Sequence, residues 1–127
     1  MQDRYTFEYA IIRIVPRVER EEFFNVGVIL FCKQKKFLGI KYQIDPEKLK
    51  AFSPDVELDV FKKYLKAWDL VCEGSSRGGK IGAMELSDRF RWLTACRSTI
   101  IQSSKTHPGL SDDPQQTLEN IFEKQVL

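Results

Sequence analysis

Hydrophobic and polar residues alternate along the N-terminal third of the chain in a way that predicts β-strands. Residues 5–15 begin with strict alternation and then become apolar on both sides, which is typical of a strand entering the middle of a sheet. Residues 26–33 are almost continuously apolar, and residues 38–44 alternate again. The charged connection 17–25 and a lysine-rich turn separate these stretches. The pattern therefore predicts three consecutive antiparallel strands, with a bulge or close backbone approach at Gly27.

Helical periodicity follows the predicted strands. Asp45 and Pro46 predict the start of a short helix, because aspartate caps helix N-termini and proline fits the first helical position. Residues 58–72 carry apolar side chains at spacings of three and four, which predicts the clearest helix of the chain. It should end at Gly74, and residues 75–80 should form a flexible loop and be the best candidate for disorder.

The C-terminal part continues with a mixture of elements. Ser87 should cap a further helix, residues 99–104 read as a strand, and residues 105–110 read as a turn. Asp113 followed by Pro114 predicts the start of the last helix. The predicted fold is one α+β domain over residues 1–127. A three-stranded N-terminal meander plus a later strand forms an antiparallel sheet that packs against helices on one face.

Composition places the chain among ordinary globular proteins, with 43% hydrophobic and 30% charged residues. Three scattered cysteines argue against a disulfide framework and a zinc site, and Cys32 and Cys72 should be small buried side chains. The longest apolar run, residues 26–32, is far shorter than the roughly 20 residues that span a bilayer. With no signal-peptide pattern at the start, we expect a cytoplasmic protein with no membrane association.

The net charge of +2 is too small for a general polyanion binder, but the charge is unevenly distributed. Residues 1–44 carry 8 basic and 5 acidic side chains, a net of +3. Residues 86–110 carry 4 basic and 1 acidic, again +3, whereas residues 111–127 carry 1 basic and 4 acidic, a net of −3. If the two basic stretches meet in the fold, they form one basic face.

No familiar catalytic motif occurs in the chain. It contains no glycine-rich nucleotide loop, no HExxH metal motif and no GxSxG nucleophile motif. We therefore expect no enzymatic activity, no cofactor and no metal. A phosphoester-cleaving enzyme that uses His107 with an arginine is an outside alternative.

Arginines dominate the two basic stretches, and their planar guanidinium groups suit bidentate contact with phosphate or carboxylate. Short hydroxyl side chains and the only histidine, expected on a turn, accompany the second stretch. The competing interpretation is that these arginines pair with neighbouring carboxylates and bind nothing. The candidate recognition surface consists of Arg13, Arg17, Arg20, Arg89, Arg91, Trp92, Arg97, Ser98 and His107.

Residues 8–32 and 89–114, EYAIIRIVPRVEREEFFNVGVILFC and RFRWLTACRSTIIQSSKTHPGLSDDP, resemble the signature blocks of an uncharacterised bacterial family, the domain-of-unknown-function 3037 family. The resemblance extends over residues 5 to about 125, and it implies a small stand-alone bacterial protein without known activity. Genes of such proteins often neighbour those of HipA-like serine/threonine kinases, so the resemblance implies a HipA-like kinase as a possible partner. Cys96 and the 105–106 dipeptide depart from the expected family pattern, which weakens any special role for the 103–106 loop or for that cysteine.

Two functions of different classes follow from these residues. The first is a non-enzymatic protein–protein interaction or adaptor module that uses the arginine-rich surface, with Trp92 as an aromatic anchor. The second is a nucleic-acid or phosphate binder in which Arg13, Arg17, Arg20, Arg89 and Arg97 contact phosphates.

Overall fold

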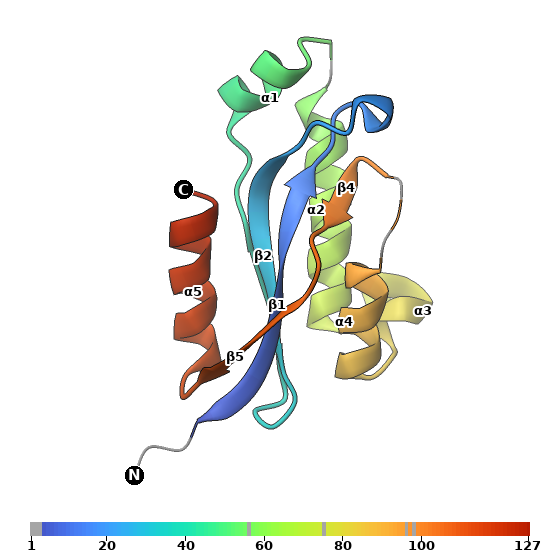
Figure 1. The fold of residues 1–127 in the computed structure, drawn as a ribbon. Coiled ribbons are helices and arrows are strands. Elements are labelled where there is room, and N and C mark those ends of the chain that lie inside the picture. The colour runs from blue at the N-terminus through green and yellow to red at the C-terminus, as the bar shows by residue number, and fades with distance from the viewer. Residues whose placement is uncertain (1–3, 56, 75, 96, 98) are drawn as a thin grey trace.

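A computed structural model describes residues 4–127 except 56, 75, 96 and 98 (Figure 1). Its strands form one antiparallel sheet in the order β3-β2-β1-β4, with β5 also paired to β1. The strands are β1 (Tyr5–Ile14), β2 (Phe24–Cys32), β3 (Phe37–Tyr42), β4 (Ile101–Ser103) and β5 (His107–Ser111). The helices are α1 (Pro46–Phe52), α2 (Leu58–Glu73), α3 (Gly79–Gly82), α4 (Leu86–Thr94) and α5 (Pro114–Gln125), with short 3-10 turns η1 (Val18–Arg20) and η2 (Ser76–Gly78).

The predicted α+β class and the N-terminal meander are confirmed, and so are the two helix starts at Asp-Pro. Asp45 and Asp113 accept hydrogen bonds from the first-turn N–H groups of α1 and α5, and a proline occupies the first helical position of each. Helix α2 ends at Gly74 in the left-handed conformation, as predicted, with φ at 76°. Local sequence chemistry therefore determines where these helices begin and end.

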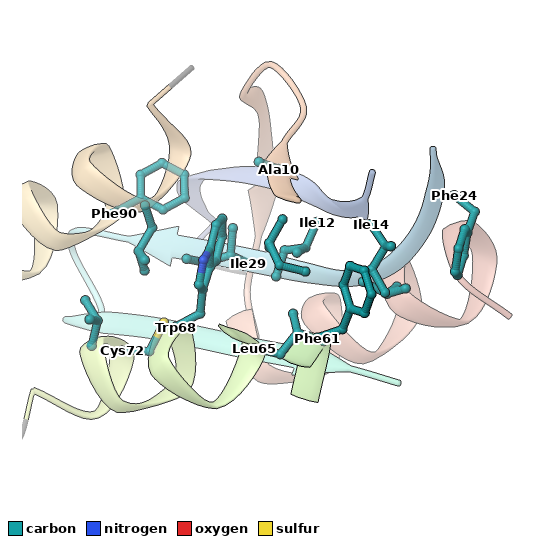
Figure 2. Packing of buried hydrophobic residues seen from close by; sticks show 14 of the residues in the cluster. Ala10, Ile12, Ile14, Phe24, Ile29, Phe61, Leu65, Trp68, Cys72 and Phe90 are labelled. Atoms are coloured by element: carbon teal, nitrogen blue, oxygen red, sulfur yellow. The ribbon is translucent and has the colours of Figure 1, made fainter. Parts of the chain in front are cut away.

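Helices cover both faces of the sheet, not one face as predicted. Helix α2 packs on one face, and Figure 2 shows its Phe61, Leu65 and Trp68 among the strand residues Ile12 and Ile29. Helix α5 packs Leu118 and Phe122 on the other face, against alternate strand residues that include Val28 and Leu30. The reason is that β2 is apolar on both sides, so each side has to be removed from water.

The predicted irregularity at Gly27 is a β-bulge. Ile12 is paired with Gly27 while Arg13 is paired with Asn25, so Val26 is the extra residue. A Cβ atom added at Gly27 would lie 2.7 Å from the Lys41 carbonyl oxygen, which no real side chain tolerates. The extra residue shifts the alternation of β2 by one position. Val26, before Gly27, and Ile29, after it, therefore both face the α2-side core.

Four predictions for the C-terminal half are wrong in detail. Residues 75–80, expected as a flexible loop, contain η2 and the start of α3, apart from Ser75, which lies outside the described residues. The later strand is only three residues long, and the helix expected to be capped by Ser87 begins at Leu86 after Glu85. The expected turn over residues 105–110 is largely strand β5.

Tertiary pairing explains the strand at β5. Its residues pair with the first half of β1, from Tyr5 opposite Ser111 to Tyr9 opposite His107. Gly109, which reads as a turn signal, instead makes room for the Phe7 ring, since an added Cβ would lie 2.4 Å from that ring. Within the part of the chain that the structure describes, no helix is long and apolar enough to cross a membrane.

The bulge generates the first testable prediction. We expect Gly27→Ala to lower the free energy of unfolding by about 1–3 kcal/mol, because the new methyl group overpacks β2 against β3. Urea denaturation followed by circular dichroism measures the change. The exposed residue Lys63 is the control, since Lys63→Ala should stay within about 0.5 kcal/mol of wild type. Equal stability of the two variants would contradict the close approach.

Candidate functional site

Arg89 is a buried structural side chain and not a surface residue as predicted. It is 9% exposed, and its Nη1 donates hydrogen bonds to the carbonyl oxygens of Val71 and Cys72, each at 2.9 Å. These carbonyls end helix α2, where the helix dipole favours a cation. Gly74 gives the guanidinium its space, because an added Cβ would lie 2.6 Å from Nη1. Arg89 therefore joins α4 to the C-terminus of α2.

Arg91, on the exposed side of α4, pairs with a carboxylate of the sheet. Its two terminal nitrogens lie 2.5 and 2.8 Å from the oxygens of Glu8, in a bidentate arrangement. The hydrogen bond to Glu8 raises the pKa of the Arg91 guanidinium above its usual value. This arginine is occupied in holding α4 to β1.

The three N-terminal candidate arginines also have neighbours within the chain. Arg17 lies 3.9 Å from Asp55, and Arg20 lies 2.6 Å from Glu22, both as exposed ion pairs. The guanidinium of Arg13 stacks 4.1 Å from the ring centre of Phe23. The competing interpretation, in which charges are neutralised locally, thus describes Arg17 and Arg20.

The two basic stretches do not form one shared face. Arg17 pairs with a residue just before the N-terminus of α2, whereas Arg89 binds the C-terminus of that helix. A helix of 16 residues is about 24 Å long, which separates the two stretches, and Figure 1 shows η1 and α4 near opposite ends of α2. Arg13 faces the α5 side of the sheet, because its β1 neighbours Ile12 and Ile14 face α2.

His107 and Ser98 complete the predicted set. His107 lies exposed on β5 and not on a turn, with its ring centre 5.3 Å from that of Tyr9. Ser98 lies outside the described residues.

An open groove of about 430 Å³ lies between α2, α4 and β4. Its volume falls in the range of about 300–1,000 Å³ that is usual for ligand sites. Most of its lining is apolar and comes from both helices, from α3 and from the sheet edge. Representative lining residues are Tyr64, Trp68, Ile81, Trp92, Leu93 and Ile101.

Two arginines, Arg77 and Arg97, also line the groove. The guanidinium of Arg97 lies over the Trp92 ring, 3.9 Å from its centre, and donates a hydrogen bond to the Trp92 carbonyl oxygen. Within the described ranges, neither arginine forms an ion pair. The groove therefore combines an apolar floor with cationic groups that no described carboxylate neutralises.

Of the predicted recognition residues that the structure describes, Trp92 and Arg97 line this groove. Sequence reasoning missed the contribution of η2 and α2, above all Arg77 and Tyr64. Tyr64 gave a weak signal, because it is an aromatic residue outside the apolar stripe of α2, and it is 47% exposed. Arg77 gave none, since its position depends on how residues 76–82 fold back on α2.

Two hydroxyl side chains of the groove and the buried Cys72 thiol are engaged or shielded within the chain. The two hydroxyls are engaged as donors, Thr99 to the Ile101 carbonyl and Ser103 to the Ser104 carbonyl. Burial raises the pKa of the Cys72 thiol, at the end of α2, to about 12. No cluster of three or more His, Cys, Asp or Glu side chains suited to a metal ion occurs among the described residues.

Comparison with known proteins adds one match. A family described as proteins of unknown function, DUF3037, matches the sequence over residues 9–126. No curated protein matches the chain. No solved structure matches it.

The contrast between Arg89 and Arg91 can be tested by substitution. Arg89→Met keeps much of the side-chain volume but leaves the last carbonyls of α2 without their donor, so the free energy of unfolding should fall by about 2–3 kcal/mol. Arg91→Met is the matched control on the same helix, and losing its exposed ion pair should cost at most about 1 kcal/mol. Chemical denaturation of both variants measures the difference. A larger loss for Arg91→Met would overturn the structural role given to Arg89.

The buried thiols provide a second test. Because the pKa of Cys72 is about 12 and not 9.0, its thiolate fraction at pH 8 is about a thousandfold lower than that of an ordinary cysteine. In a Cys96→Ser variant at pH 8, Ellman's reagent should leave Cys32 and Cys72 unmodified in the folded protein and should modify both in denaturant. Rapid modification of either thiol in the folded protein would show that these cysteines are accessible.

Proposed function

We propose that this chain, which belongs to the DUF3037 family, is a non-enzymatic module that recognises a protein partner through the groove between α2, α4 and β4. The proposal keeps the predicted interaction role but moves it from a broad arginine-rich surface to one groove. Trp92 and Arg97 remain from the predicted set, and Tyr64 and Arg77 join them.

The observation that carries the proposal is the stacked pair of Trp92 and Arg97 beside an apolar floor. Tryptophan, tyrosine and arginine are the residue types that most often dominate the energy of protein interfaces. Trp92 is 39% exposed, which leaves part of a large aromatic side chain in water next to an unfilled groove. A partner that covers this ring removes apolar surface from water and gains a cation that is already positioned.

The partner that the family resemblance implies remains a HipA-like kinase, and the expected location remains the cytoplasm. The chemistry of the groove does not select a kinase over another protein. The apolar lining and the two arginines of the groove favour a partner segment that is apolar and carries negative charge.

The alternative of a nucleic-acid binder receives less support from the arrangement of the arginines. Of its five proposed phosphate contacts, Arg89 is buried, and Arg17 and Arg20 are paired with carboxylates. Arg13 and Arg97 face different sides of the molecule. Few guanidiniums are therefore left to follow one phosphate backbone.

Affinity capture after chemical cross-linking in the native cell tests the proposal. We expect a stoichiometric protein to be recovered with the wild-type chain and to be depleted about 30-fold by Trp92→Ala, which corresponds to about 2 kcal/mol at an interface anchor. Leu110→Ser is the matched control, because Leu110 is an exposed apolar residue on β5, at 62% exposure, outside the groove.

Two results would contradict the proposal, provided that circular dichroism shows all variants folded. Equal recovery by wild type and Trp92→Ala would remove the groove as the binding site. Recovery of nucleic acid in place of protein, with binding that weakens steeply between 50 and 200 mM salt, would establish the alternative function.

A further inference from the structure

The groove is bordered by the free edge of a β-strand. β4 pairs with β1 on one side and is the last strand of the described sheet on the other. All three of its residues line the groove, although their side chains alternate between the two faces of the sheet. Because consecutive residues that point to opposite faces all line the groove, the backbone edge of β4 contributes to this wall.

The register of the β1–β4 pair shows which backbone groups point into the groove. The flanking hydrogen bonds run from Val15 N–H to the Ile100 carbonyl and from Ser104 N–H to the Ile11 carbonyl. Gln102 therefore directs its N–H and C=O toward β1, and Ile101 and Ser103 direct theirs away from it. Among the described residues, the Ile101 carbonyl accepts a hydrogen bond from Thr99 at 2.6 Å, which leaves two N–H groups and the Ser103 carbonyl toward the groove.

The charge and the apolar lining of the groove further restrict what can bind there. Arg77 and Arg97 provide positive charge without a described carboxylate partner, so the occupant should carry negative charge. The apolar floor of the groove favours hydrophobic side chains at other positions of the same occupant. A helix satisfies its own backbone groups and cannot use the edge of β4, whereas an extended chain can.

We propose that an extended acidic segment of a partner protein adds as a strand to β4, with alternate apolar side chains in the groove and a carboxylate on Arg97 or Arg77. The inference rests on the proposed function and specifies how the same groove is occupied. Main-chain hydrogen bonds to Ile101 and Ser103 supply affinity, and the alternate side chains supply specificity.

Selection from a library of random 12-residue peptides, displayed on phage and presented to the immobilised full chain, tests this inference without knowledge of the natural partner. We expect enrichment of sequences that alternate apolar residues with Asp or Glu. A synthetic peptide of the enriched sequence should bind the double variant Arg77→Glu, Arg97→Glu at least about tenfold more weakly, because two attractive charges become repulsive. Arg20→Glu, which reverses an exposed charge outside the groove, is the matched control and should bind like wild type.

N-methylation of single peptide amides identifies the binding mode. In a strand added to β4, only alternate amides face the strand, so methyl groups on one alternating set should weaken binding at least about tenfold and those on the other set should not. If binding is lost in Trp92→Ala but no N-methyl group weakens it, strand addition is overturned and the groove remains the interface. Enrichment of basic or uncharged peptides would overturn the acidic partner. Failure to enrich any peptide over the double variant, together with equal capture by Trp92→Ala in cells, would overturn both proposals.

Discussion

The antiparallel pair of β1 and β2 is apolar on both faces, and this double burial is the constraint on which the other elements depend. One face carries Ala10, Ile12 and Ile29, and the opposite face carries Ile11 and Val28. Neither face can be left to water, so α2 covers one and α5 covers the other. The bulge at Gly27 shifts the alternation of β2 by one residue, so that Val26 and Ile29, on either side of it, both point toward α2.

The groove follows from how the α2 face is covered. Helix α2 is joined to α4 by the Arg89 hydrogen bonds to its last carbonyls, and α4 is held to the sheet by Arg91 and Glu8. These contacts fix α4 beside α2, and the short strand β4 returns past both helices to pair with β1. The space between the three elements is not filled by described side chains, and Trp92 borders it.

The arginines show why a charge pattern is an incomplete guide to a binding site. Five of the predicted residues are arginines whose guanidiniums are occupied within the chain, by carbonyls, by carboxylates or by an aromatic ring (Arg13, Arg17, Arg20, Arg89 and Arg91). Of the predicted arginines, only Arg97 lines the groove, and its guanidinium lies over the Trp92 ring. The residue types do not separate these cases, because the partners of Arg17, Arg89 and Arg91 are distant along the chain, whereas Arg20 pairs with the nearby Glu22.

By itself, the sequence determined the elements whose causes are local. The Asp-Pro pairs began α1 and α5, and the three-and-four spacing with Gly74 bounded α2. The apolar and alternating stretches identified the meander, and the glycine within the second strand identified the irregularity at Gly27. Only the tertiary structure decided that helices cover both faces, that residues 107–111 pair with β1, and that Arg77 and Tyr64 share a groove with Trp92. The physical reason is the distance along the chain between the residues that interact. Caps and amphipathic stripes act over a few residues, whereas strand pairing, buried charge and the groove arise from contacts between segments tens of residues apart.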